Sequence, residues 1–260
     1  MKKLTLSRKV FSYPYILFML LFVVTPLVLI LVNAFIVDGK IDFSNFVDYF
    51  GNPANMNVLT LSIEVGVITT LLCLLIGYPT AYLLSKMNAG KLLVLIFIMP
   101  MWVNFLLRTL ATKTIFEALG VQLGIGTVIA GMVYNYLPMM ILPLHTTISG
   151  IDKSYIEAAG DLGASPLRVF TRVVVPMSMT GIISGITMVF IPTISTFAIS
   201  QLLSNSSIYL FGDSIQLKFD QGMYGVGSVM SIVMLVLVLL SNFIINKVSG
   251  RDNQNRSTLL

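Results

Sequence analysis

The sequence predicts an all-α polytopic membrane protein with six transmembrane helices and both termini in the cytoplasm. Apolar residues make up 56% of the 260 residues and charged residues only 10%, whereas soluble domains carry about 25% charge. The apolar residues also occur in runs long enough to cross a bilayer, which takes about 20 residues as a helix. A soluble monomer could not hide so much apolar surface.

Six apolar segments are predicted to span the membrane. They are Phe11–Ile36, Val58–Leu84, Leu92–Leu110, Thr127–His145, Met177–Ser200 and Val226–Ile245. The first follows a basic N-terminus, as a signal peptide does, but its apolar run is long and no small-x-small cleavage site follows. We therefore expect it to be a retained membrane anchor.

Lysine and arginine predict the orientation. Twelve of them fall in segments on one side of the predicted spans: Lys2, Lys3, Arg8, Lys9, Lys86, Lys91, Lys153, Arg168, Arg172, Lys247, Arg251 and Arg256. Four lie on the other side or at its edge: Lys40, Arg108, Lys113 and Lys218. Basic residues stay in the cytoplasm during insertion. We thus expect a first part at residues 1–57, a membrane domain at 58–248 and a cytoplasmic tail at 249–260.

Several classes of function are excluded by what the chain lacks. It has one cysteine, Cys73, and one histidine, His145, so it offers no metal-binding cluster and no nucleophile with a paired base. It has no phosphate-binding loop for ATP chemistry, so we expect no catalytic residues and no cofactor in this chain. The net charge is +5, but the basic residues are scattered between apolar runs, which argues against nucleic-acid binding. A passive channel remains an alternative.

The polar segment at residues 150–175 is predicted to form a helix–turn–helix on the cytoplasmic side. Ser154 and Glu157 match a capping box at a helix start. Ile156, Ala159 and Leu162 then give that helix one apolar face. Two later features complete the pattern: Gly163 is a natural C-terminal stop, and Ser165-Pro166 is typical of a second helix start.

This segment contains Glu157-Ala158-Ala159, then three residues, Gly163, nine residues and Val173-Val174-Val175-Pro176. Their order and spacing resemble the EAA loop of bacterial ABC import permeases, E-A-A-x3-G-x9-I-x-L-P. Only Val173 and Val175 depart from the pattern, and both departures are conservative. The resemblance implies a type I ABC importer permease fold in the bacterial cytoplasmic membrane. It also implies that the loop docks on an ATPase through Glu157, Ala158, Ala159, Asp161, Gly163 and Pro176.

The resemblance further implies the partners. They are a second permease subunit, two ATP-binding cassette subunits that hold ATP and magnesium, and an external substrate-binding protein. Other segments resemble permeases of spermidine/putrescine importers: Gly77-Tyr78-Pro79, Ala81, Lys86, Met99-Pro100, Trp102, Asn104, Arg108-Thr109, Asp161–Ser165 and Gly212–Phe219. They imply a polyamine cargo. A permease for an inorganic anion or a cofactor precursor is the alternative.

A polyamine pathway should offer carboxylates, amide oxygens and aromatic faces to ammonium groups. Eight residues are candidates: Glu64, Trp102, Asn104, Tyr134, Asn135, Tyr136, Thr193 and Phe197. The acids of the outer segments, Asp38, Asp42, Asp48, Glu117, Asp213 and Asp220, modestly favour a cation.

Structural roles compete with each pathway assignment. Glu64 could instead pair with Arg108 or Lys113, and Trp102 and Arg108 could anchor the chain at the interface. Asn104 could bond between helices, and Thr193 could bond its own helix backbone. His145 is expected at the membrane edge.

Overall fold

The computed structural model describes residues 12–37 and 39–257. The predicted cytoplasmic residues Lys2, Lys3, Arg8 and Lys9 therefore lie outside the described residues, as do Asp38 and the side chains of Arg251 and Arg256. The chain divides into two compact units. The smaller comprises the residues before Asn57 together with Ile215–Val236, and the larger comprises Asn57–Ser214 and the residues from Leu237 onward.

The smaller unit begins with the first predicted span, which appears as one apolar stretch, Tyr13–Phe35. It consists of α1 (Ser12–Met19), a π turn (Leu20–Val24) and α2 (Thr25–Phe35). The π turn closes where the Thr25 N–H donates to the Leu20 carbonyl. The next residue, Pro26, has no N–H and would press on a carbonyl of the preceding turn, so a wider turn accommodates it.

A short β-hairpin follows α2 and was not predicted. Strands β1 (Ile36–Val37) and β2 (Lys40–Ile41) pair antiparallel, with Gly39 at φ +76° in the turn. The all-α fold class stands, and this pairing of two-residue strands is a local feature that was missed although the Asp-Gly pair in the sequence is a hairpin signal. Helix α3 (Ser44–Gly51) comes next, and the unit also takes in the end of α13 (Phe211–Asp220) and the start of α14 (Tyr224–Ser257).

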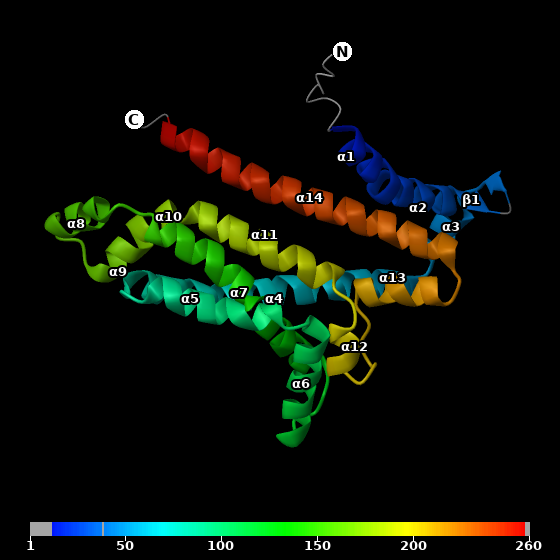
Figure 1. Cartoon of the computed structure of the whole chain (residues 1–260), viewed down its shortest axis with the longest axis horizontal. Helices are drawn as coiled ribbons and strands as arrows, with labels where there is room; N and C mark the ends of the chain where they lie inside the picture. The colour runs from blue at the N-terminus through cyan, green and yellow to red at the C-terminus, as the bar shows by residue number, and fades with distance from the viewer. Residues whose placement is uncertain (1–11, 38, 258–260) are drawn as a thin grey trace, which may run out of the picture. The chain divides into compact units, whose positions relative to one another are not determined.

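The larger unit is helical throughout its described part (Figure 1). Its elements are α4 (Pro53–Lys86), α5 (Gly90–Ile98), a 3₁₀ turn (Met99–Trp102), α6 (Phe105–Ala118), α7 (Ile125–Ser149), α8 (Lys153–Asp161), α9 (Pro166–Val169), a π turn (Phe170–Val174), α10 (Val175–Met177), α11 (Met179–Ser195) and α12 (Ile199–Leu203). The first part of α13 and the end of α14 complete it.

Among the described residues, four helices are long and apolar enough to cross a membrane: Tyr13–Phe35, Pro53–Lys86, Ile125–Ser149 and Tyr224–Ile245. Two helix pairs also qualify but are bent, by 93° between Gly90–Trp102 and Phe105–Ala118 and by 66° between Pro166–Met177 and Met179–Ser195. The number of spans reaches the predicted six if each bent pair counts as one.

The third predicted span, Leu92–Leu110, is therefore wrong as a continuous helix. Pro100 lacks a backbone donor, and the side chain of Asn104 accepts a hydrogen bond from Leu106 N (2.8 Å), which caps a new helix. The fifth predicted span also ends early. Helix α11 passes through Pro192 and stops at Ser195, before Ala198 takes a left-handed conformation (φ 70°).

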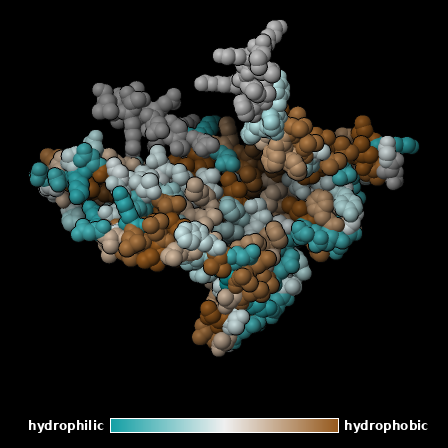
Figure 2. Space-filling model, viewed as in Figure 1, coloured by the Kyte–Doolittle hydropathy of each residue, from teal (hydrophilic) through white to brown (hydrophobic). Residues whose placement is uncertain are grey.

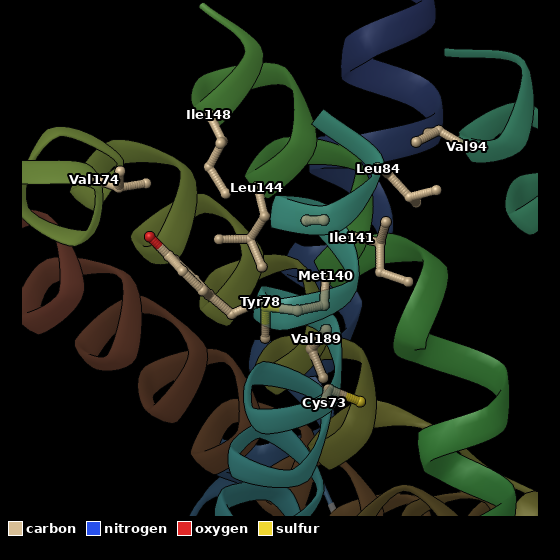
Figure 3. Packing of buried hydrophobic residues seen from close by; sticks show 11 residues of the cluster. Cys73, Tyr78, Leu84, Val94, Met140, Ile141, Leu144, Ile148, Val174 and Val189 are labelled. Carbon is tan, nitrogen blue, oxygen red and sulfur yellow. The ribbon is translucent and has the colours of Figure 1, made fainter. Parts of the chain in front are cut away.

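The core of the larger unit forms where α7 packs against α4 and α11. Met140 of α7 occupies the centre: a Cβ on Gly77 of α4 would lie 3.0 Å from Met140 Cγ, and one on Gly185 of α11 would lie 2.5 Å from Met140 Sδ. Figure 3 shows Met140 in the cluster with Tyr78 and Val189. Glycine allows this close approach because it has no side chain.

Hydroxyl groups inside the spans mostly bond their own helix. Thr70 donates to the Gly66 carbonyl (2.7 Å), and Thr187 donates to the Ile183 carbonyl (2.9 Å). A polar side chain keeps a hydrogen-bond partner in this way where water is excluded. A hydroxyl in these spans is therefore not by itself a sign of a transport pathway.

Candidate functional site

Helix α8 begins with an aspartate cap. The Asp152 carboxylate accepts a hydrogen bond from Ser154 N (2.9 Å), and this bond holds the pKa of Asp152 below its usual range. The predicted capping box of Ser154 and Glu157 is wrong, because Asp152 lies two residues earlier and already caps the helix. The predicted helix itself is present.

Helix α8 ends at Asp161, and Gly163 follows the C-cap Leu162 as the left-handed stop residue, as predicted. Gly163 has φ +78°, its N–H donates to the Gly160 carbonyl (2.8 Å), and the Ala164 N–H donates to the Ala159 carbonyl (3.1 Å). These two bonds form a Schellman motif, which needs a left-handed residue after the helix. Pro166 then starts α9 as its first residue, as expected.

The residues of the EAA pattern are largely exposed. Glu157, Ala158 and Asp161 are exposed, Ala159 is half-buried, and Pro176 lies half-buried in α10. Ile156 packs against the core. The predicted apolar face is wrong in one member, because Leu162 caps the helix end and is 89% exposed.

Three large apolar side chains lie exposed in this segment: Tyr155, Leu162 and Leu167. The α8 end of the larger unit is otherwise mostly hydrophilic (Figure 2). Exposed apolar side chains rimmed by polar residues are typical of a protein–protein contact.

The second half of the segment is anchored on α4 by aromatic contacts. The Phe170 ring meets Tyr78 edge-on at 5.5 Å and Tyr82 edge-on at 5.0 Å. The Tyr78 hydroxyl is hydrogen-bonded to the Ser178 hydroxyl at 2.7 Å, and both groups are buried. Ser178 lies at the bend into α11. These contacts join the segment directly to α4 and to the bend into α11.

A cavity of about 350 Å³ lies where the two broken spans approach α7. Its lining comes from the bend before α6, from α6, α7 and the end of α11: Met101, Phe105, Arg108, Asn135, Tyr136, Met139, Pro192, Ser195, Thr196, Phe197 and Ile199. Discontinuous membrane helices are where transporters usually place their polar sites. This is the candidate pathway site.

Two side chains of this cavity have buried polar atoms without a hydrogen-bond partner: Arg108, through Nε and Nη1, and Asn135, through Oδ1. The Asn135 amide nitrogen, in contrast, donates to the Gly131 carbonyl (2.9 Å) and contacts Thr109 Oγ1 (3.5 Å). Buried polar groups are normally paired, so these atoms point to an interaction that the residues described here do not complete.

Three of the eight predicted pathway residues line this cavity: Asn135, Tyr136 and Phe197. The other five do not. Glu64 and Tyr134 are exposed, and Trp102 is 78% exposed at the bend. Asn104 caps α6. Thr193 is buried and donates to the Val189 carbonyl (2.6 Å), which is the backbone role weighed as its alternative.

Lys113 and His145 differ from expectation, the first in its partner and the second in its place. Lys113 forms its salt bridge with Glu117 (3.8 Å) rather than with Glu64. His145 is buried, with its ring nitrogen 3.3 Å from the Ser149 hydroxyl, rather than exposed at the membrane edge.

Asp213 is a structural residue rather than an outer acid that attracts a cation. It is fully buried, and its carboxylate accepts hydrogen bonds from Ala198 N (2.7 Å), Leu210 N (2.9 Å) and the Ser200 hydroxyl. It thereby holds the segment between α11 and α13, beside the cavity residues Phe197 and Ile199. Sequence reasoning missed both this role and the place of Arg108, although charged residues beside apolar runs were the available signal.

The profile of the family described as "binding-protein-dependent transport system inner membrane component" matches residues 5–251. The spermidine/putrescine transport system permease protein PotB of Haemophilus influenzae is 34% identical over 253 residues, covering 87% of this chain and 88% of that protein. PotB of Escherichia coli is 34% identical over 226 residues, covering 77% and 82%.

The fold is also found in solved structures. A bacterial alginate ABC transporter, in complex with an alginate pentasaccharide-bound periplasmic protein, contains a chain that superposes with a TM-score of 0.68. The match covers 94% of this chain and 93% of that one at 15% identity, which establishes a shared ABC permease fold. By profile, sequence identity and fold, the chain belongs to the family of inner-membrane components of binding-protein-dependent transport systems.

Proposed function

We propose that the chain is the permease subunit of an ATP-driven ABC importer that carries polyamines, spermidine or putrescine, across the cytoplasmic membrane. The observation that carries the proposal is the 34% identity with spermidine/putrescine permeases over most of both chains. The aromatic rings, hydroxyls and amide of the cavity support it, because such groups accommodate flexible amines.

The energy source is proposed to lie in partner subunits. ATP and magnesium would bind two ATP-binding cassette subunits, and this chain would hold no cofactor of its own. The exposed Tyr155, Leu162 and Leu167 beside Glu157 support a docking surface for an ATPase. A second permease and an external substrate-binding protein would complete the transporter.

The anchoring contacts support an alternating-access transport cycle. ATP-driven closure of the ATPases would move α8 and α9, and the contacts of Phe170 and Ser178 with α4 would pass that movement to the spans. Cargo would then enter from the binding protein and leave inward after hydrolysis. A passive channel would have no use for such a link.

Uptake of labelled spermidine and putrescine by cells with the gene deleted, and by cells with it restored, tests the cargo. Deletion should abolish the ATP-dependent part of the uptake, and depletion of ATP should do the same in complemented cells. Uptake that persists without ATP would indicate a channel.

A second cargo class is favoured by one observation, the unpaired Arg108 guanidinium in the cavity. A fixed cation suits an anionic cargo better than a polyamine. If deletion abolishes uptake of an anion and leaves polyamine uptake unchanged, the alternative replaces the main proposal.

A further inference from the structure

Arg108 is the group that the proposed function leaves unexplained. It lies on the first turn of α6, and its Nε and Nη1 atoms are buried in the cavity without a hydrogen-bond partner. A guanidinium has five N–H donors and stays charged at all physiological pH values. The side chain as a whole is half-buried, but these two nitrogens have no acceptor, so an anion near Arg108 would be favourable.

The larger unit does not supply that anion from its own acids. The Asp213 carboxylate is already used by Ala198 N, Leu210 N and the Ser200 hydroxyl. Glu117 pairs with Lys113, and this is the salt bridge found within the described part of the chain. Neither Glu64 nor any other acid lines the cavity. Among the described residues of the larger unit, therefore, no acid pairs with Arg108.

The cavity walls indicate which anion fits. Phe105 and Phe197 meet edge-on at 6.1 Å, and Met101, Met139 and Pro192 extend this apolar wall. Arg108 supplies the positive charge, and the side-chain hydroxyls of Ser195 and Thr196 are further donors. One planar carboxylate on an apolar stem matches this set, because a guanidinium pairs well with a carboxylate. By neutralising Arg108, that carboxylate would also remove the repulsion that an ammonium group would otherwise meet beside the aromatic rings and hydroxyls of the cavity.

We propose that the Arg108 cavity is a carboxylate-binding socket, filled in the assembled transporter by an acidic side chain of the second permease subunit. The inference rests on the proposed function at two points. It takes the second permease as a partner, and it takes the cargo as a polyamine, which carries no carboxylate. A free organic acid would offer the same chemistry, so the experiment must separate the two sources.

Charge reversal tests the socket in the complete transporter, with its ATPases and second permease. Arg108→Gln should lower spermidine uptake and the amount of intact complex recovered by about tenfold or more, because it strands a buried carboxylate. Arg108→Lys should lose less, since it keeps the charge. Lys113→Gln on the same helix removes a cation from a partly exposed pair and is the matched control, expected to behave as the unchanged protein.

The source of the carboxylate is found by pairing Arg108→Glu with changes in the partner. Each membrane-embedded Asp or Glu of the second permease is replaced by Lys in turn. The expected result is that one replacement restores recovery of the complex. If no replacement restores recovery of the complex, or if Arg108→Gln leaves uptake and recovery unchanged, the proposal is overturned.

A free carboxylate is examined with the purified complex, by comparing its melting temperature in potassium acetate and in potassium chloride of equal ionic strength. No Arg108-dependent difference is expected, and an increase in acetate that Arg108→Gln abolishes would assign the socket to a small anion instead. Recovery of the complex does not depend on cargo. A rescued charge swap in a transporter that carries no polyamine would therefore refute the proposed cargo and leave the socket standing.

Discussion

The cytoplasmic segment around α8 and the cavity around Arg108 satisfy their polar groups in opposite ways. Around α8 the partners are close in sequence: Asp152 bonds Ser154, and Gly163 bonds Gly160. Around the cavity they are distant, as with Asp213 and Ala198, or absent, as with Arg108. The polar groups of the first region are thus satisfied by near neighbours, whereas the second leaves Arg108 Nε and Nη1 without a partner among the described residues.

The largest effect on stability should come from breaking the hydrogen bonds beside the cavity that join residues far apart in sequence. Asp213→Asn replaces one acceptor oxygen by a donor that faces buried N–H groups, and should lower stability by about 3 kcal/mol. Thermal unfolding of the purified protein measures this. Asp220→Asn, on the same helix but exposed, is the control; equal losses for both variants would contradict the structural role of Asp213.

A smaller effect should follow from Gly163→Ala in the cytoplasmic segment. A Cβ there meets nothing within 4 Å, so the cost comes from the left-handed backbone alone, about 1–2 kcal/mol. Gly160→Ala is an ideal comparison, because its surroundings are equally open but its φ is not positive. It should stabilise α8 by about 0.5–1 kcal/mol. Amide exchange in α8 measures both changes in stability. If the two substitutions change the exchange rate in the same direction, the assignment of Gly163 as the helix stop is refuted.

Removing a contact between the loop and the spans should have a smaller effect on stability still. Tyr78→Phe removes the hydrogen bond to Ser178 and should cost about 1 kcal/mol. If this contact transmits movement, ATP hydrolysis by the assembled transporter should respond less to loaded binding protein while assembly is unchanged. Tyr82→Phe removes a hydroxyl from the other ring that meets Phe170 and should leave that response intact.

The smallest effect concerns the cap of α8 and depends on pH. The pKa of Asp152 is lowered in the folded state by the hydrogen bond from Ser154. Its contribution is therefore present above the unfolded pKa of about 3.9 and is lost as the pH falls through the lower folded value. Asp152→Ala should speed amide exchange in the first turn of α8 at pH 7, whereas Ser154→Ala should not. The reverse result would restore Ser154 as the cap.

The sequence predicted some local features, although it misplaced the cap of α8 and missed the β-hairpin, and it missed the contacts between distant residues. Gly163 as a helix stop and Pro166 as a helix start depend on neighbouring residues, so both were correct. Hydropathy counts apolar residues whether or not the backbone bends, so Leu92–Leu110 was read as straight although Asn104 caps a new helix inside it. The pairing of Tyr78 with Ser178, 100 residues apart in sequence, leaves no trace in local spacing.

The candidate site divides in the same way. The EAA pattern is contiguous, and the family resemblance identified it. The cavity draws on α6, α7 and the end of α11, so only residues already notable in their own helix, such as Asn135 and Tyr136, could be proposed. Arg108 was interpreted as an interfacial anchor, since its burial depends on the unpredicted bend before α6.

The π turn at Phe170–Val174 limits where residues can be inserted into this protein or deleted from it. The turn holds one residue more than an α turn and closes where Val175 N–H donates to the Phe170 carbonyl, just before Pro176. Deleting one residue there would rotate α9 by about 100° relative to α11 and turn Phe170 away from Tyr78. A deletion in the short connection at 119–124, which joins α6 to α7, would carry no such rotation into the α4 contact. Insertions and deletions should therefore be tolerated in that connection and excluded between Pro166 and Ser178.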